Sequence, residues 1–313
     1  MFRSALLRIV SPTITLAIGL VTAAMSNSIA QAQDGQLSFQ SADEAVAKLV
    51  EAVRSKDVEE IVNVLGPGGR DIASSGDPVA DQARLTKFLE AFDQRHQVQK
   101  EDASEAVLLV GEDEFPFPIP IVLEDGEWYW DTDQGLDEIL TRRIGENELA
   151  SIEVMLGYVA AQYEYAEQDR DGKGGQYARR LMSREGQRDG LYWPVSDGEE
   201  QSPIGPLIAE AQSKGYSGTG SGPAYNGYVF RVLYGQGKSA EDGARDYIIN
   251  GRMIGGFALI ATPAEYANSG VMTFIVNQDG VIYEKDLGPN TLERAAGIRV
   301  FDPDPTWKKV DED

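Results

Sequence analysis

The stretch from Glu146 to Glu167, ENELASIEVMLGYVAAQYEYAE, decides the fold of the larger part of this chain. Its apolar side chains recur three and four residues apart, a spacing that predicts a long helix with one apolar seam. The seam consists of Leu149, Ile152, Leu156, Val159, Tyr163 and Ala166. We expect this helix to be the spine of a C-terminal domain.

The residues after this helix predict a small antiparallel sheet. A short helix through Met182 and a second at about residues 207–212 come first. Strands are then expected at residues 228–234, 257–262, 271–276 and 281–285. One long helix packed on such a sheet resembles the globular head of type IV pilin-like proteins. Pilus assembly is not implied, because a whole domain precedes the helix here.

The residues before the long helix predict an N-terminal domain of helices followed by strands. Ser41 and Glu44 form a capping box at the start of a helix that runs to about Ser55. Further helices are expected at residues 58–65 and 79–95, and strands at residues 106–110, 117–123 and 128–130. This order resembles, by topology alone, the cone-shaped fold of nuclear transport factor 2-like or cystatin-like proteins.

These elements divide the chain into two α+β domains behind a leader. The predicted junction is Arg142-Arg143-Ile144-Gly145, between the meander and the long helix. The expected parts are a signal peptide at residues 1–32, an N-terminal α+β domain at residues 33–143 and a pilin-like α+β domain at residues 144–313.

The first 32 residues have the layout of a secretory signal peptide. Two arginines precede an apolar run from Ile9 to Ala24, and small side chains at Ala30 and Ala32 fit signal peptidase. The run of 16 residues is shorter than the roughly 20 that a membrane-spanning helix needs. We therefore expect cleavage between Ala32 and Gln33, a periplasmic location and no stable membrane anchor after cleavage.

Composition excludes several partners and chemistries. The net charge of −23 repels nucleic acids and anionic lipid head groups, so we expect no nucleic-acid partner. The chain has no cysteine, hence no disulfide and no catalytic thiol. We expect no cofactor.

Several long blocks of sequence carry a family resemblance. They include FPFPIPIV at residues 115–122, DGLYWP at 189–194, SPIGPLIAEA at 202–211, GGFALIATPAEYANSGVMTFIVNQDG at 255–280 and KDLGPNT at 285–291. On these blocks the chain resembles the exported bacterial proteins called domain of unknown function 2950, across nearly all of the mature chain. The resemblance implies no reaction, ligand or catalytic residue.

One loop has part of a calcium-binding pattern. Asp169 and Asp171 begin the sequence Asp-Arg-Asp-Gly-Lys-Gly, in which carboxylates two residues apart can wrap a calcium ion. Lys173 replaces the third oxygen ligand, and Arg180 stands where a bidentate glutamate belongs. A surface loop is therefore favoured, with Asp169 and Asp171 as weak calcium candidates.

The remaining candidates are one histidine and a group of carboxylates and aromatic residues. His96 is the only histidine, which excludes multi-histidine zinc sites and favours a hydrogen-bonding role at a helix end. Glu127 and Asp131 belong to a carboxylate-rich region around Trp128 and Trp130, an arrangement that can cleave a glycoside. The alternative places these tryptophans in a core.

Tyr192 and Trp193 present the same choice between a surface and a core. The two residues either form an exposed aromatic platform for a partner or cap the core of the C-terminal domain. Because no catalytic set is complete, we expect a non-enzymatic binding or accessory module of the cell envelope. Its partner would be an envelope protein or a surface polymer, with Tyr192, Trp193, Trp128 and Trp130 as candidate contacts. The alternative function is a carboxylate-dependent hydrolase of envelope glycans.

Overall fold

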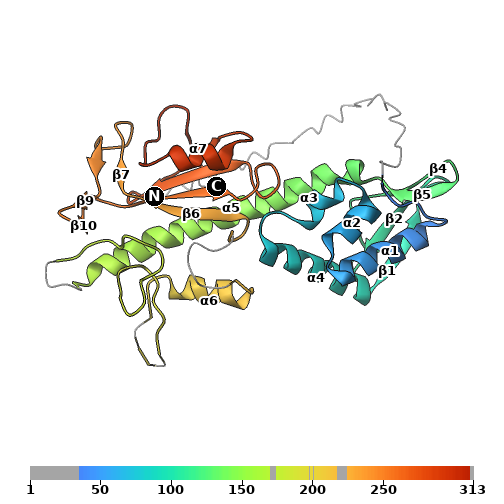
Figure 1. Ribbon diagram of the computed structural model, residues 1–313, viewed down its shortest axis with the longest axis horizontal. Helices are drawn as coiled ribbons and strands as arrows, with labels where there is room; N and C mark the ends of the chain where they lie inside the picture. The colour runs from blue at the N-terminus through green and yellow to red at the C-terminus, as the bar shows by residue number, and fades with distance from the viewer. Residues whose placement is uncertain (1–34, 170–173, 197, 200, 217–223, 311–313) are drawn as a thin grey trace, which may run out of the picture. The chain divides into compact units, whose positions relative to one another are not determined.

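The computed structural model describes residues 35–169, 174–196, 198–199, 201–216 and 224–310 (Figure 1). The predicted leader and its cleavage site lie outside these residues. The fold is α+β, as the sequence predicts. Among the described helices, none is long and apolar enough to cross a membrane.

Four helices open the described chain. They are α1 (Ala42–Ser55), α2 (Val58–Leu65), α3 (Gly69–Ala73) and α4 (Pro78–Gln94). The predicted cap of α1 is confirmed, because the Ser41 hydroxyl accepts a hydrogen bond from the backbone N–H of Glu44 at 3.1 Å. Sequence reasoning missed α3, which begins inside a glycine-rich stretch. A Cβ at Gly69 would lie 2.8 Å from the Cβ of Leu65, so glycine is what lets α3 follow α2 so closely.

The first sheet follows these helices and packs against them. Its strands are β1 (His96–Lys100), β2 (Glu105–Val110), β3 (Phe115–Pro116), β4 (Ile121–Glu124) and β5 (Glu127–Trp130). Their order is β1-β2-β4-β5, all antiparallel, and β3 also pairs with β2. β1 was not predicted because its mostly polar, exposed side chains carry no burial signal. Buried side chains of α1, α2 and the sheet form one hydrophobic cluster.

A single helix, α5 (Thr132–Glu167), then runs for 36 residues. It begins at Thr132 rather than at Glu146, with Asp131 as its N-cap. The predicted junction at residues 142–145 lies inside this helix, and the division into domains there stays a prediction. Gly145 does not end the helix, because one glycine costs only about 1 kcal/mol and Arg143 beside it is held by tertiary hydrogen bonds.

The second sheet confirms the four strands predicted for the C-terminal part. Its members are β6 (Tyr228–Leu233), β11 (Ala258–Pro263), β12 (Met272–Asn277), β13 (Ile282–Asp286) and β14 (Lys308–Lys309). The order is β14-β13-β12-β11-β6, and all pairs are antiparallel. α5 and α7 (Thr291–Gly297) lie on opposite faces of the sheet (Figure 1), so every residue of the interior strand β11 is buried.

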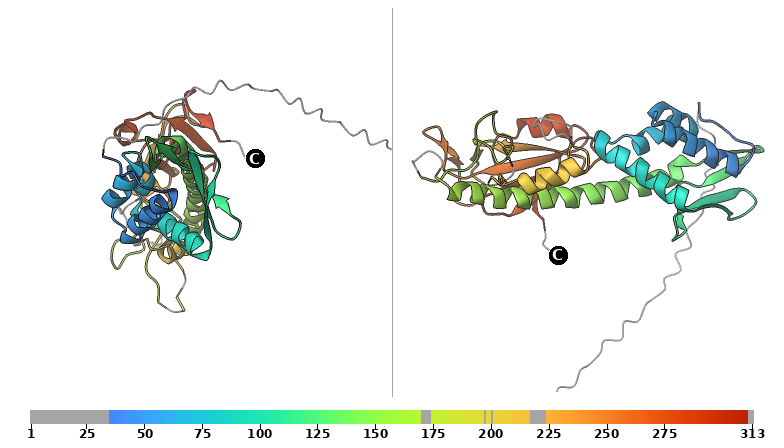
Figure 2. Two further views of the ribbon diagram at one scale, coloured as in Figure 1. Left: turned by 90° about the vertical axis from the view of Figure 1, so that its right-hand side faces the viewer. Right: turned by 90° about the horizontal axis from the view of Figure 1, so that it is seen from below.

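Smaller elements complete the fold around this sheet. They are α6 (Gly205–Ser213), β7 (Gly235–Gln236), β8 (Arg245–Asp246), β9 (Ile248–Ile249) and β10 (Arg252–Met253). α6 lies beside α5, where a Cβ at Gly157 would come within 2.9 Å of Leu207 (Figure 2). A second hydrophobic cluster fills the space between α5 and the sheet.

The helix predicted through Met182 is wrong. The described residues 174–182 contain no helix. The side-chain amide of Gln162 instead binds both backbone groups of Ala178: its Nε2 donates to the carbonyl at 2.9 Å, and its Oε1 accepts from the N–H at 2.8 Å. The buried backbone is therefore satisfied by a side chain and does not need helical hydrogen bonds.

Candidate functional site

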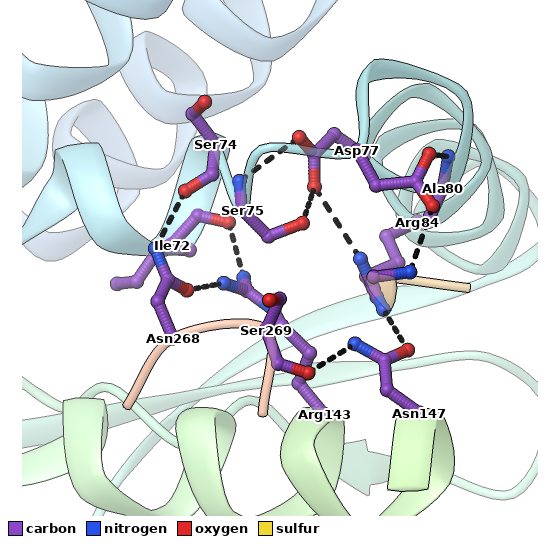
Figure 3. A network of polar contacts seen from close by, with 12 residues as sticks. Ile72, Ser74, Ser75, Asp77, Ala80, Arg84, Arg143, Asn147, Asn268 and Ser269 are labelled. Atoms are coloured by element: carbon purple, nitrogen blue, oxygen red, sulfur yellow. Dashed lines mark hydrogen bonds and ion pairs between the residues drawn. The ribbon is translucent and has the colours of Figure 1, made fainter. Parts of the chain in front are cut away.

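Buried polar side chains form a network that joins four distant parts of the sequence. Three of them are drawn in Figure 3: the residues around the start of α4, the middle of α5 and the loop between β11 and β12. The fourth is the segment before β6, which Asp77 reaches. The buried members are Ser75, Asp77, Asp81, Arg143, Asn147, Asn268 and Ser269. An unpaired buried polar group costs free energy. The hydrogen-bond partners of these groups therefore show whether the network is structural or is available to a ligand.

Asp77 is the N-cap of α4 and is fully buried. Its Oδ1 accepts a hydrogen bond from the backbone N–H of Ala80 at 3.1 Å. Its Oδ2 accepts from the hydroxyl of Tyr216 at 2.7 Å and from the backbone N–H of Gly227 at 2.9 Å. Gly227 has a φ of +73°, and a Cβ there would lie 2.4 Å from Asn147 Nδ2. The carboxylate thus ties the start of α4 to the segment before β6, and only glycine fits at position 227.

Asp81 lies one turn further along α4. Its Oδ2 accepts from the backbone N–H of Ser75 at 3.0 Å, and its Oδ1 accepts from the Ser75 hydroxyl at 2.6 Å. The same Oδ1 receives a longer contact from Arg84 at 3.3 Å. Arg84 also donates to Asn147 Oδ1 at 3.1 Å, so this arginine links α4 to α5.

Arg143 supplies the largest contribution from α5. Its guanidinium donates to the carbonyls of Asp71 and Ile72, each at 2.6 Å, and to Oδ1 of Asn268. Burial, helped by the positive charge of Arg84, lowers the pKa of Arg143 to about 10. The side chain therefore stays protonated at neutral pH and holds three acceptors at once.

Asn147 and Asn268 close the network from opposite sides. Asn147 Nδ2 donates to the carbonyl of Ser269 at 2.8 Å. Asn268 Nδ2 donates to the carbonyl of Ser74 at 2.9 Å and to Glu265 Oε2 at 3.0 Å. The loop between β11 and β12 is thereby bound both to α5 and to the connection between α3 and α4.

The arrangement is a structural anchor. Both carboxylates are buried and accept hydrogen bonds from groups of the chain itself, so neither is presented to a substrate. Sequence reasoning missed the network because it interpreted Arg143 as part of a junction. The available signal was the polar residues Arg143, Asn147 and Ser151, which recur every four residues on one helix face.

Trp128 and Trp130 lie in the first hydrophobic cluster. The indole N–H of Trp130 donates to the carbonyl of Ala45 at 3.2 Å, and the ring is fully buried. Trp128 is also buried, and its backbone forms an isolated antiparallel β-bridge with that of Phe39. The structure therefore agrees with the core alternative for both tryptophans and leaves them no ring face for a partner.

Trp193 is likewise buried, whereas Tyr192 is half-buried. The Trp193 ring packs edge-on against Tyr165 at 6.5 Å, and the guanidinium of Arg188 lies over it at 5.3 Å. The backbone of Tyr192 pairs with residues 181 and 183. Here too the structure agrees with the core alternative for the tryptophan.

The predicted calcium candidates are only partly covered by the structure. Asp169 is exposed just after α5, and Asp171 lies outside the described residues. Across the residues that are described, no group of three or more histidine or acidic side chains is placed to hold a metal ion. Calcium binding by this loop stays a prediction.

His96 begins β1, directly after α4. Its Nδ1 lies 2.9 Å from the carbonyl of Phe92 in the last turn of α4, and its ring stacks on Phe92 at 3.7 Å. The predicted hydrogen-bonding role at a helix end fits this geometry.

The candidate carboxylates of the meander also have local partners. Glu127 accepts a hydrogen bond from the Ser38 hydroxyl, and Asp131 accepts from the backbone N–H of Gln134 at 3.3 Å. Partial burial raises the pKa of Asp131. No bond joins the two carboxylates to each other among the described contacts.

Exposed apolar side chains recur along one side of α5. Leu149 is 66% exposed, Leu156 47% and Tyr163 45%. These three residues form what we call the outward stripe, spaced seven residues apart on the helix. The predicted apolar seam is thus only partly buried: Ile152 and Val159 pack against the core, whereas Leu149 and Leu156 do not. Tyr163 is exposed on one side, and its ring meets the core residue Phe257 on the other.

Comparison with known proteins gives one match. The family described as "Protein of unknown function (DUF2950)" matches residues 36–310. No curated protein and no solved structure matches the chain. The likeness to pilin-like heads and to nuclear transport factor 2-like or cystatin-like folds therefore stays a prediction.

Proposed function

The chain belongs to the DUF2950 family of proteins of unknown function, and we propose that it is an exported, non-catalytic binding module of the cell envelope. The sequence of the first 32 residues supports export, with removal of the leader between Ala32 and Gln33. The partner is an envelope protein or a surface polymer.

The outward stripe of α5 is the observation that carries the binding proposal. Large exposed apolar side chains that line up on one rigid helix favour a surface that a partner covers over one that stays in contact with water. The helix that bears them is fixed to the rest of the fold by Arg143 and Asn147. A surface held in this way keeps its shape before binding, which lowers the entropy cost of association.

Fractionation of the native host tests the export step. We expect the protein in the periplasmic fraction, with a mass that corresponds to a chain beginning at Gln33. A cytosolic species that keeps Met1 would contradict export.

Photo-crosslinking in the same cells tests the binding step. A photo-reactive amino acid in place of Leu156 should form an adduct with a larger envelope component. The matched control replaces Leu292 of α7, which is 55% exposed but lies outside the outward stripe. Equal adducts from both positions, or none from position 156, would contradict a binding role for α5.

The raised pKa of Asp131 supports a second candidate, a hydrolase of envelope glycans. A general acid must carry its proton, and a raised pKa changes Asp131 in that direction. Purified protein and the variants Glu127→Gln and Asp131→Asn can be incubated with peptidoglycan fragments and the products followed by mass spectrometry. Turnover that both substitutions abolish would establish the hydrolase and displace the binding module. We expect no turnover by any of the three proteins.

A further inference from the structure

We propose that the outward stripe of α5 is the docking site for a basic amphipathic helix of another envelope protein. This inference rests on the proposed binding function and names the class of partner. It is carried by the spacing of the stripe, by its attachment to the core and by the charges beside it.

The spacing of the stripe fits a helix. Leu149, Leu156 and Tyr163 repeat every seven residues over four turns, or about 21 Å along the axis of α5. Positions seven residues apart drift by only about 20° around an α-helix, so a partner helix can follow this row in side-by-side packing. A helix of about 15 residues, with leucines on one face, can cover it.

One end of the stripe is held rigidly. The Tyr163 hydroxyl donates to the carbonyl of Gln278 at 2.7 Å, and its ring meets Phe257 and Tyr177 edge-on at 5.5 Å and 6.1 Å. Although 45% of Tyr163 is exposed, the ring therefore has a fixed orientation. A tyrosine ring that is already ordered loses little conformational entropy on binding. Tyrosine is also enriched among the residues that contribute most to binding energy at interfaces.

The charges beside the stripe select a basic partner. Residues 144–167 contain five glutamates and no lysine or arginine. Glu146, Glu153 and Glu164 are exposed next to the stripe, three residues before Leu149, three before Leu156 and one after Tyr163. The nearby cation Lys214 already pairs with Glu210 at 2.8 Å. An incoming helix flanked by lysine or arginine gains attraction along its whole length.

The same charges disfavour two other occupants. A second copy packed on the stripe would bring its own acidic row against this one, at a net charge of −23 for each chain. A membrane surface would bring anionic head groups against the glutamates, whereas helices that lie on membranes carry basic residues beside their apolar face.

Synthetic peptides test the proposal directly. The probes are three 18-residue helical peptides with the same leucine face, whose flanking residues are all lysine, all glutamate or all glutamine. Binding to the purified protein is followed by fluorescence anisotropy at low and at physiological salt. We expect the lysine peptide to bind at least tenfold more tightly than the others, and its affinity to fall as salt rises.

Matched variants locate the site. Leu156→Glu should reduce affinity for the lysine peptide at least tenfold, whereas Leu292→Glu on α7 should leave it unchanged. Leu156→Glu places a charge within the stripe and can alter α5 as well as binding. A second variant therefore tests the charge preference without changing the stripe. The double substitution Glu146→Lys, Glu153→Lys alters only exposed side chains, and it should shift the preference toward the glutamate peptide.

Three outcomes of the peptide and sedimentation measurements would overturn the inference. The first is equal binding of the three peptides, and the second is tight binding of the lysine peptide that survives Leu156→Glu. The third is a concentration-dependent dimer in sedimentation analysis that Leu156→Glu dissociates, which would assign the stripe to a second copy. A crosslink from position 156 to a polysaccharide would refute this inference while leaving the proposed binding function intact.

Discussion

Each of the two long faces of α5 departs in part from the usual pattern of an amphipathic helix. The face toward the rest of the fold buries Arg143, Asn147 and Gln162, all of which hydrogen-bond to backbone groups of other segments. The opposite face exposes Leu149 and Leu156. In an ordinary helix of a globular protein the polar residues face solvent and the leucines face the core.

The difference separates two tasks on one helix. Buried polar groups bind only partners in the right geometry, so the inward face fixes which segments meet α5. Apolar groups exposed to water gain free energy when anything apolar covers them, so the outward face is suited to association. The inward face is therefore expected to control stability and the outward face binding.

Arg143→Ala is expected to have the largest effect on stability. It leaves the buried side-chain amide of Asn268 and the partly buried carbonyls of Asp71 and Ile72 without their donor, which should cost about 3 kcal/mol of unfolding free energy. Urea denaturation followed by circular dichroism measures the change. The neighbouring Arg142→Ala is the control, because Arg142 is half-exposed and its contacts with Glu138 and with the exposed Phe115 ring lie at the surface. It should cost less than about 1 kcal/mol. Similar losses for the two variants would argue against the anchor.

Asp77→Ala should have the next largest effect. Its carboxylate caps α4 and accepts from Tyr216 and Gly227, so its removal strands three donors in the interior. We expect a loss of about 2–4 kcal/mol in the same denaturation assay. Asp57→Ala provides the comparison, since Asp57 is the exposed N-cap of α2 and its carboxylate accepts from the backbone N–H of Glu59 in its own helix. The Asp57 variant should lose about 1 kcal/mol. Equal costs would mean that the tertiary hydrogen bonds of Asp77 add nothing.

Leu156→Ala should change stability least. Its side chain is half-exposed, so the unfolding free energy should move by no more than about 1 kcal/mol. The adjacent Met155→Ala empties a fully buried position and should cost about 2–5 kcal/mol. A Leu156 variant as unstable as the Met155 variant would mean that the outward stripe is covered in the folded protein.

The outward stripe also shows where sequence reasoning ends. Periodicity identified the helix and its apolar seam, because spacing is a local property. It could not decide which face is buried, since that depends on the partners brought by other segments. On the inward face, Arg143 donates hydrogen bonds to the carbonyls of Asp71 and Ile72. Gln162 donates to the carbonyl of Ala178.

Other elements divide in the same way. Caps, turns and alternating apolar residues are local sequence signals. They allowed the prediction of α1, α2, β6, β11, β12 and β13. α3 and β1 could not, since α3 depends on close approach at Gly69 and β1 is a polar strand that β2 pairs with. The polar network around Arg143 could not be predicted for the same reason, because its hydrogen bonds join residues up to 194 positions apart in the chain.

Thiol labelling tests the buried and exposed faces of α5 most directly, because the chain contains no cysteine of its own. Leu156→Cys and Met155→Cys each introduce a single thiol, at neighbouring positions that differ in burial. We predict that a maleimide labels the thiol of the Leu156 variant at least about 100-fold faster under native conditions, and that urea removes the difference. Equal rates in the folded protein, or faster labelling of the Met155 variant, would contradict the account.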